Sequence, residues 1–199
     1  MPRLSRATRA CREFEAEIDN LLELEGHIPK LGADLWAGKQ WKVGWYVTMI
    51  SISAYSAWER LVEKLLFACL STNTCAFASS LDLSLPTRVS VDLSEALLTS
   101  RSGYLDFRGT SELIGATRKW LSPNPFDKMT QMQKKVVDDL RVIRNAVVHG
   151  SRKADRDMKK RFGPRATTVS VLMRQTAGQT TLRKYLADLK QLSTTLSSP

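Results

Sequence analysis

Histidine and cysteine are scarce in this chain of 199 residues, which has two histidines and three cysteines. The cysteines, Cys11, Cys69 and Cys75, are odd in number and form no CxxC pair. This pattern argues against a disulfide framework and against a zinc site. We therefore expect reduced, partly buried thiols and neither a metal ion nor another cofactor.

Long hydrophobic runs are also missing. The uncharged segment at residues 43–58 contains several Ser and Thr residues and is shorter than the ~20 residues that span a bilayer. The first residues of the chain include no apolar segment of the kind found in signal peptides. We therefore expect a cytoplasmic protein without a membrane partner, and a buried helix at 43–58.

Acidic residues are outnumbered, with 20 Asp and Glu against 30 Lys and Arg, so the formal net charge is +10. A surplus of this size favours polyanions such as RNA, DNA or acidic membranes. The hydrophobic share of 43% and the charged share of 25% are ordinary for a globular protein. The length fits one domain, assigned to residues 1–199.

Apolar residues recur at spacings of three and four along four segments, which predicts amphipathic helices. The segments are residues 3–25, 40–70, 130–149 and 180–196. Gly26 and Pro29 are expected to end the first helix. The second helix is apolar on more than one face, tryptophans included, and is expected in the middle of a bundle.

The remaining segments lack long periodic runs. Residues 71–126 are expected to form a loop-rich insertion, irregular over 71–90 and with short helices near 93–100 and 111–121. The sequence pattern of residues 167–173 predicts either a short strand or an extended edge. Together these patterns predict an all-α fold, an up-and-down helical bundle with a small irregular insertion.

The helix at 130–149 has clear end signals and carries the most informative motif. Thr130 and Gln133 match a capping box, and Gly150 stands where a glycine stop is expected. Asn145 and His149 differ by about 40° around the helix, and Arg141 lies about 80° from His149. Arg141, Asn145 and His149 therefore form one polar strip, and Arg144 is long enough to reach back to it.

These residue types suit the cleavage of a phosphodiester. Imidazole transfers protons near neutral pH, and guanidinium offers parallel N–H groups to phosphate. In this hypothesis His149 is the general acid and base, Arg144 stabilises the phosphorane, and Asn145 orients the histidine or the substrate. Arg141 and the residues after the helix would supply further phosphate contacts.

Simpler interpretations also fit. His149 could cap the helix, while Arg144 pairs with Asp138 or Asp139 on the surface. The basic segment 151–165 either contacts RNA phosphates or is a solvated loop. The candidate RNA-binding residues within it are Arg152, Lys153 and Arg156.

Arg144-Asn145 followed by His149-Gly150, late in a helical chain, resembles the HEPN superfamily (higher eukaryote and prokaryote nucleotide-binding domains), whose hallmark is R-x(4–6)-H. Residues 139–143 are similar to the lead-in of that motif. Residues 53–62 resemble a small-residue helix that carries a glutamate, here Glu59, in several bacterial members. Residues 14–19 are similar to the first helix of some standalone bacterial members.

The resemblance implies a HEPN-like helical bundle, usually a homodimer whose two R-x4-H motifs face each other. It also implies a metal-independent endoribonuclease of a toxin–antitoxin or antiviral defence system, with RNA as substrate and an antitoxin or other protein as partner. The expected products are 2′,3′-cyclic phosphate ends. Glu59 either supports the site by pairing with Arg144 or is a solvated position. The alternative function is a non-catalytic RNA-binding or assembly subunit of a defence system.

One departure from the family pattern limits what the resemblance implies. Several HEPN toxins have a tyrosine two residues after the histidine, where this chain has Ser151. No role of that tyrosine carries over to this chain.

Overall fold

The computed structural model describes residues 5–35, 40–99, 105 and 107–197. Within them, the α-helices are α1 (Arg6–Leu35), α2 (Gln40–Thr72), α3 (Cys75–Ser80), α4 (Val91–Thr99), α5 (Thr110–Trp120), α6 (Gln131–His149), α7 (Arg152–Phe162), α8 (Thr168–Leu172) and α9 (Thr181–Ser197). A 3-10 helix, η1 (Pro125–Lys128), precedes α6, and the two-residue strands β1 (Gln175–Thr176) and β2 (Gln179–Thr180) pair antiparallel. The prediction of an all-α fold is confirmed.

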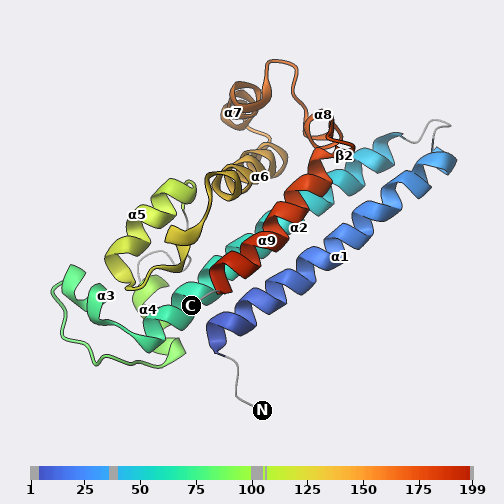
Figure 1. Cartoon of the computed structure of the whole chain (residues 1–199). Helices are drawn as coiled ribbons and strands as arrows, with labels where there is room; N and C mark the ends of the chain where they lie inside the picture. Colours follow the sequence, from blue (N-terminus) through green and yellow to red (C-terminus); the bar gives the residue numbers. More distant parts are fainter. Residues whose placement is uncertain (1–4, 36–39, 100–104, 106, 198–199) are drawn as a thin grey trace, which may run out of the picture.

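Four long helices, α1, α2, α6 and α9, form the body of the molecule, with α3–α5 at one end and α7 and α8 at the other (Figure 1). Polar pairs between helices give their directions. The pairs are Arg60–Glu17 and Lys64–Glu13 for α2 and α1, Lys190–Asp19 and Arg183–Glu25 for α9 and α1, and Gln133–Thr195 and Asp139–Tyr185 for α6 and α9. In each pair of helices, the residue numbers rise along one helix as they fall along the other. The two helices of each pair are therefore antiparallel.

The end predicted for the first helix is wrong, because α1 continues through Gly26 and Pro29 to Leu35. Tertiary contacts explain the continuation. Ile28 is buried, and the buried carboxylate of Glu25 accepts hydrogen bonds from Thr180 and Arg183. These contacts outweigh the local preference of glycine and proline for a helix end.

Two further segments are helical where the sequence patterns indicated otherwise. Residues 167–173, expected as a strand or extended edge, contain α8, and the solvated-loop interpretation of 151–165 is wrong because α7 occupies it. Ser151 caps α7 by accepting a hydrogen bond from the backbone N–H of Ala154 at 3.2 Å. Ala154 and Met158, one turn apart, are buried and hold α7 against the bundle. The loop at 71–90 also contains a short helix, α3.

Helix α6 begins and ends as the sequence predicts. The Thr130 hydroxyl accepts a hydrogen bond from the Gln133 N–H at 3.2 Å, and the Gln133 side chain accepts one from the Thr130 N–H at 2.9 Å. Gly150 ends the helix in the left-handed region at φ 52°. Since both ends are fixed, His149 is held at the last position of the helix.

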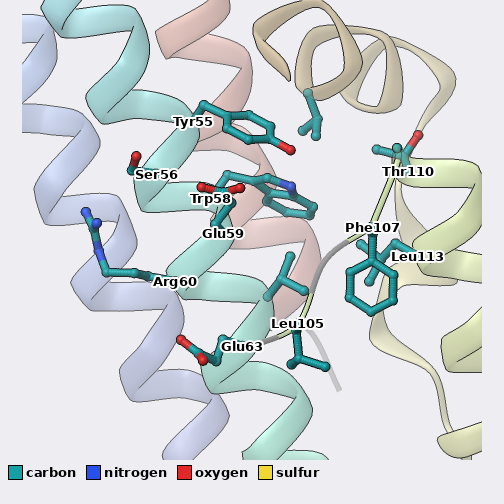
Figure 2. Close-up of a pocket in the computed structure, with 13 residues that line it drawn as sticks. Tyr55, Ser56, Trp58, Glu59, Arg60, Glu63, Leu105, Phe107, Thr110 and Leu113 are labelled. Atoms are coloured by element: carbon teal, nitrogen blue, oxygen red, sulfur yellow. The ribbon is translucent and has the colours of Figure 1, made fainter. Parts of the chain in front are cut away.

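The insertion is tied to α6 and faces α2. The backbone N–H and the hydroxyl of Thr110, at the start of α5, donate to Asp138 of α6 at 2.9 and 3.0 Å. Phe107 lines a pocket opposite Tyr55 and Glu59 of α2 (Figure 2). The insertion therefore closes one side of the space between α2 and α6.

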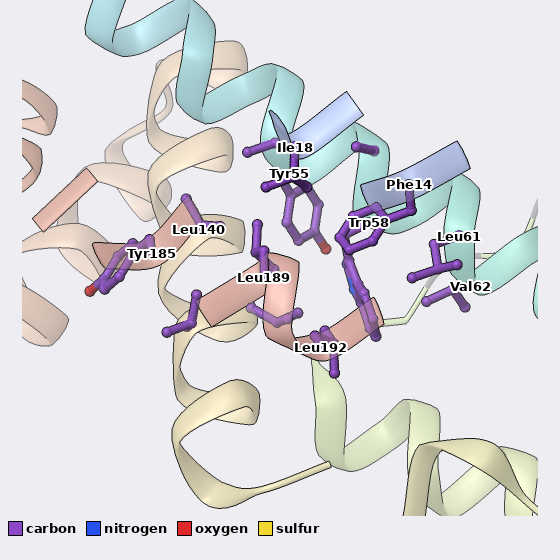
Figure 3. Close-up of a cluster of buried hydrophobic side chains, with 14 of the residues drawn as sticks. Phe14, Ile18, Tyr55, Trp58, Leu61, Val62, Leu140, Tyr185, Leu189 and Leu192 are labelled. Carbon is purple, nitrogen blue, oxygen red and sulfur yellow. The ribbon is translucent and has the colours of Figure 1, made fainter. Parts of the chain in front are cut away.

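The hydrophobic core lies between α1, α2, α6 and α9, as Figure 3 shows. Its fully buried side chains include Ile18 of α1, Leu61 of α2, Leu140 of α6 and Leu189 of α9. The second helix is expected in the middle of the bundle, with residues 43–58 buried, but Trp41 and Trp45 at the amino-terminal end of α2 are exposed. No helix of the described residues is long and apolar enough to cross a membrane.

Candidate functional site

The motif residues meet at the carboxyl end of α6. The guanidinium of Arg144 donates from Nη1 to Oδ1 of Asn145 at 3.2 Å, and the same Nη1 lies 3.2 Å from Nε2 of His149. Arg144 thus curls back along the helix to reach the histidine, as its length allows. Asn145 orients the arginine in this arrangement.

The nature of the contact between Arg144 and His149 depends on which ring nitrogen carries the proton. A guanidinium has only N–H donors, so the 3.2 Å contact is a hydrogen bond when Nε2 carries a lone pair. The ring proton then lies on Nδ1. In this geometry the Nε2 lone pair is occupied by the Arg144 N–H, so Nε2 can accept a proton from a substrate only when that contact opens.

A pocket opens beside this cluster. It is lined by the three motif residues together with Tyr55, Glu59, Arg108, Arg141, Lys153 and Asp157. These side chains come from α2, from the segment before α5, and from α6 and α7. Arginine and lysine outnumber carboxylates in the lining, which suits an anionic ligand.

Glu59 and Arg141 both lie at the pocket, as the sequence hypothesis requires. Glu59 is exposed on α2 and faces the same space as Arg144 and His149. Arg141 lines three adjoining pockets, and its Nε is buried with no hydrogen-bond partner within the part of the chain that the structure describes. An unpaired buried N–H donor in a pocket is a site where an acceptor such as a phosphate oxygen gains a hydrogen bond.

The surface pairing of Arg144 with an aspartate is wrong, because both aspartates hold other partners. Asp138 accepts from Thr110, and fully buried Asp139 accepts from Lys135 at 2.8 Å, Arg161 at 2.5 Å and Tyr185 at 2.6 Å. Burial and the hydrogen bond to Asp139 raise the pKa of the Tyr185 phenol. Asp139 therefore joins α6 to α7 and α9 and leaves Arg144 to the motif.

Only one of the three candidate RNA-binding residues lines the pocket. Lys153 lines the pocket with His149, while Arg152 and Arg156 are exposed and lie about 100° and 60° around α7 from it. The site also includes Arg108, which the sequence hypothesis did not name, and Lys160 and Arg161, which belong to the predicted basic segment 151–165 but not to its three named candidates. Lys160 and Arg161 stand seven and eight residues after Lys153, a helical spacing that could have identified them.

The second histidine of the chain, His27, is exposed on α1 and is not among the residues that line the pocket. In the described residues, no group of three or more His, Cys, Asp and Glu side chains is arranged to hold a metal ion. All three cysteines are free thiols.

Comparison with known proteins adds no relative. No family model, no curated protein and no solved structure matches this chain. The functional argument therefore depends on the motif and its geometry.

Proposed function

We propose that this protein is a metal-independent endoribonuclease of the HEPN type, acting as a toxin or an anti-phage effector. The observation that carries the proposal is the position of Arg144, 3.2 Å from the imidazole of His149 in a pocket lined by further cations. A phosphate oxygen that binds this guanidinium lies within reach of the imidazole as well. The resemblance of the motif to R-x4-H supports the same chemistry.

The reaction needs a base, an acid and a charge stabiliser. His149 takes the proton from a ribose 2′-hydroxyl as the 2′-oxygen bonds to phosphorus, and the bond from phosphorus to the 5′-oxygen breaks. The departing 5′-oxygen receives a proton from an imidazolium. Arg144, held by Asn145, neutralises the charge that builds up on the non-bridging oxygens. The products are a 2′,3′-cyclic phosphate and a 5′-hydroxyl.

A homodimer supplies both proton-transfer groups at once. Each chain contributes one histidine to its pocket, and His149 and its neighbour Val148 are exposed at the end of α6. Two such helix ends facing each other would bring a neutral and a protonated imidazole to one phosphodiester. We propose this arrangement for the active form.

The test is RNA cleavage in EDTA by the wild type, His149→Ala and Arg144→Ala. We expect the histidine variant to lose about 10²–10⁴-fold in rate, the contribution of general acid–base catalysis. We expect a loss of about 10²-fold or more for the arginine variant. Equal activity of the wild type and His149→Ala would remove the hypothesis.

The alternative, a non-catalytic subunit that binds RNA or a defence protein, predicts a different outcome. Such a protein would bind RNA without turnover, and its expression would not become less toxic in the His149→Ala variant. Toxicity on expression that this substitution relieves supports the nuclease.

A further inference from the structure

A second pocket adjoins the motif and runs between α6 and α7. We name it the α6–α7 groove, and its lining includes Arg141, His149, Lys153, Asp157, Lys160 and Arg161. Four of these side chains are cationic and one is a carboxylate. The cationic side chains of the groove outnumber its carboxylates, so the groove carries a net positive charge.

The groove has a direction that begins at the motif. Lys153 lines both the groove and the pocket of Arg144, whereas Lys160 and Arg161 line only the part farther from Arg144. Lys153 and Lys160 are seven residues apart on α7, so they lie about 20° apart around the helix and roughly 10 Å apart along it. The two ammonium groups therefore stand in line on one face.

Two guanidinium groups occupy the middle and the far end of the groove. Arg141 presents the buried Nε that has no partner among the described residues. Arg161 is fixed by its ion pair with the buried carboxylate of Asp139. Because its side chain is already ordered at the groove edge, it loses little conformational entropy when it binds a phosphate. The groove is thus a line of cations with one end at the proposed scissile phosphate.

We infer that the α6–α7 groove binds the sugar–phosphate backbone of a single RNA strand next to the scissile linkage. Lys153 contacts the phosphate adjacent to the scissile one, and Lys160, with Arg141 and Arg161, contacts those beyond. A single strand is required because the 2′-oxygen must align with the departing 5′-oxygen, which regular A-form geometry prevents. The inference rests on the proposed function for its substrate.

The chain offers a matched control on the same helix. Lys153→Ala/Lys160→Ala removes two cations from the groove, and Arg152→Ala/Arg156→Ala removes two exposed cations of α7 that do not line the groove. Both double variants carry the same net charge. Any difference between them reports position in the site and not long-range attraction. Arg161 is left intact because it pairs with Asp139.

The experiment measures binding of a labelled single-stranded RNA oligonucleotide by fluorescence anisotropy across salt concentrations, in the full chain carrying His149→Ala. We expect the groove variant to bind about tenfold more weakly. Its plot of log affinity against log salt should become shallower by about 1.4, the effect of two lost phosphate contacts on a single strand. The control variant should change by less than about threefold and keep its slope.

The outcomes separate this inference from the nuclease proposal. Equal losses in the two variants, a larger loss in the control, or no RNA binding by the parent would overturn the groove. RNA binding that depends on Lys153 and Lys160, in a protein that does not cleave, would keep the groove and reject the nuclease. Cleavage by the wild type, with equal RNA binding by both double variants, would keep the nuclease proposal and reject the groove.

Discussion

The contact between Arg144 and His149 joins side chains five positions apart on one helix, which do not lie one above the other. Asn145 makes the contact possible, because its Oδ1 accepts from the same Nη1 and holds the guanidinium near the ring. The proposed chemistry thus depends on one arginine nitrogen with two neighbours.

Gly150 holds the histidine at the helix end. Its φ of 52° is left-handed, which glycine adopts at no steric cost. We expect Gly150→Ala to lower the free energy of unfolding by about 1 kcal/mol, and Gly150→Asn to cost less because asparagine tolerates this region. Urea denaturation measures both. An alanine variant as stable as the wild type would contradict the role of this turn.

The sequence was sufficient to place the motif residues on one helix end, because end signals and helical spacing are local properties. It could not place Arg108, since that residue comes from an insertion without periodicity and reaches the pocket only through tertiary contacts. The hydrogen-bond partners of Asp138 and Asp139 could not be predicted either, because Thr110, Arg161 and Tyr185 are distant in the sequence. A pairing with Arg144 was equally compatible with the spacing.

At the scale of the helices, Asp139 is the residue that joins three elements. Its carboxylate is fully buried and accepts from α6, α7 and α9. We expect Asp139→Asn to cost about 2 kcal/mol in unfolding free energy, the value for lost hydrogen bonds between charged groups. Lys135→Ala, which removes an exposed partner, should cost less than about 1 kcal/mol. Equal effects in chemical denaturation would contradict this account.

The same network predicts a dependence on alkaline pH. Burial and the hydrogen bond to Asp139 raise the pKa of Tyr185, so the folded state holds the phenolic proton more tightly than the unfolded state does. The resulting stability is complete below the unfolded pKa of about 10 and is lost as the pH rises above it. The stability difference between wild type and Tyr185→Phe should therefore shrink above about pH 10. A difference that is constant with pH, in denaturation measured on both sides of that value, would reject the buried phenol.

Helices with long apolar periodicity could be predicted from the sequence, and those without it could not. The inward positions of α9, Leu182 through Leu196, are buried as their spacing indicates. Helix α7 has only Ala154 and Met158 on its buried face, too few to distinguish a helix from a basic loop. The extension of α1 beyond Pro29 depends on its contacts with other helices, which local preferences do not contain.

For the molecule as a whole, the four-helix arrangement predicts the reactivity of the thiols. Burial raises the pKa of Cys11 and of Cys69 to about 11, whereas Cys75 is exposed. We expect one thiol to react rapidly with a disulfide reagent near pH 8, and the other two only after unfolding, because the thiolate is the reactive form. Cys75→Ser should abolish the rapid phase. Two or more rapidly reacting thiols in the wild type would contradict the packing of α1 against α2.

The same packing leaves the end of α6 accessible beside the insertion and α7, so that one surface combines the motif, its pocket and the α6–α7 groove. The positive net charge of the chain has its proposed use at this surface. In the proposed function, proton transfer takes place at the end of α6 and substrate binding in the adjoining groove between α6 and α7.

The most direct test of the central claim is cleavage of an RNA in which the nucleotide before the mapped cleavage position carries a 2′-hydrogen in place of the 2′-hydroxyl. If His149 activates that hydroxyl, the wild type in EDTA will leave a 2′,3′-cyclic phosphate on the unmodified RNA and will not cut the modified linkage, although it binds both. Cleavage of the modified linkage at an undiminished rate would show that the 2′-oxygen is not the nucleophile and would contradict the account.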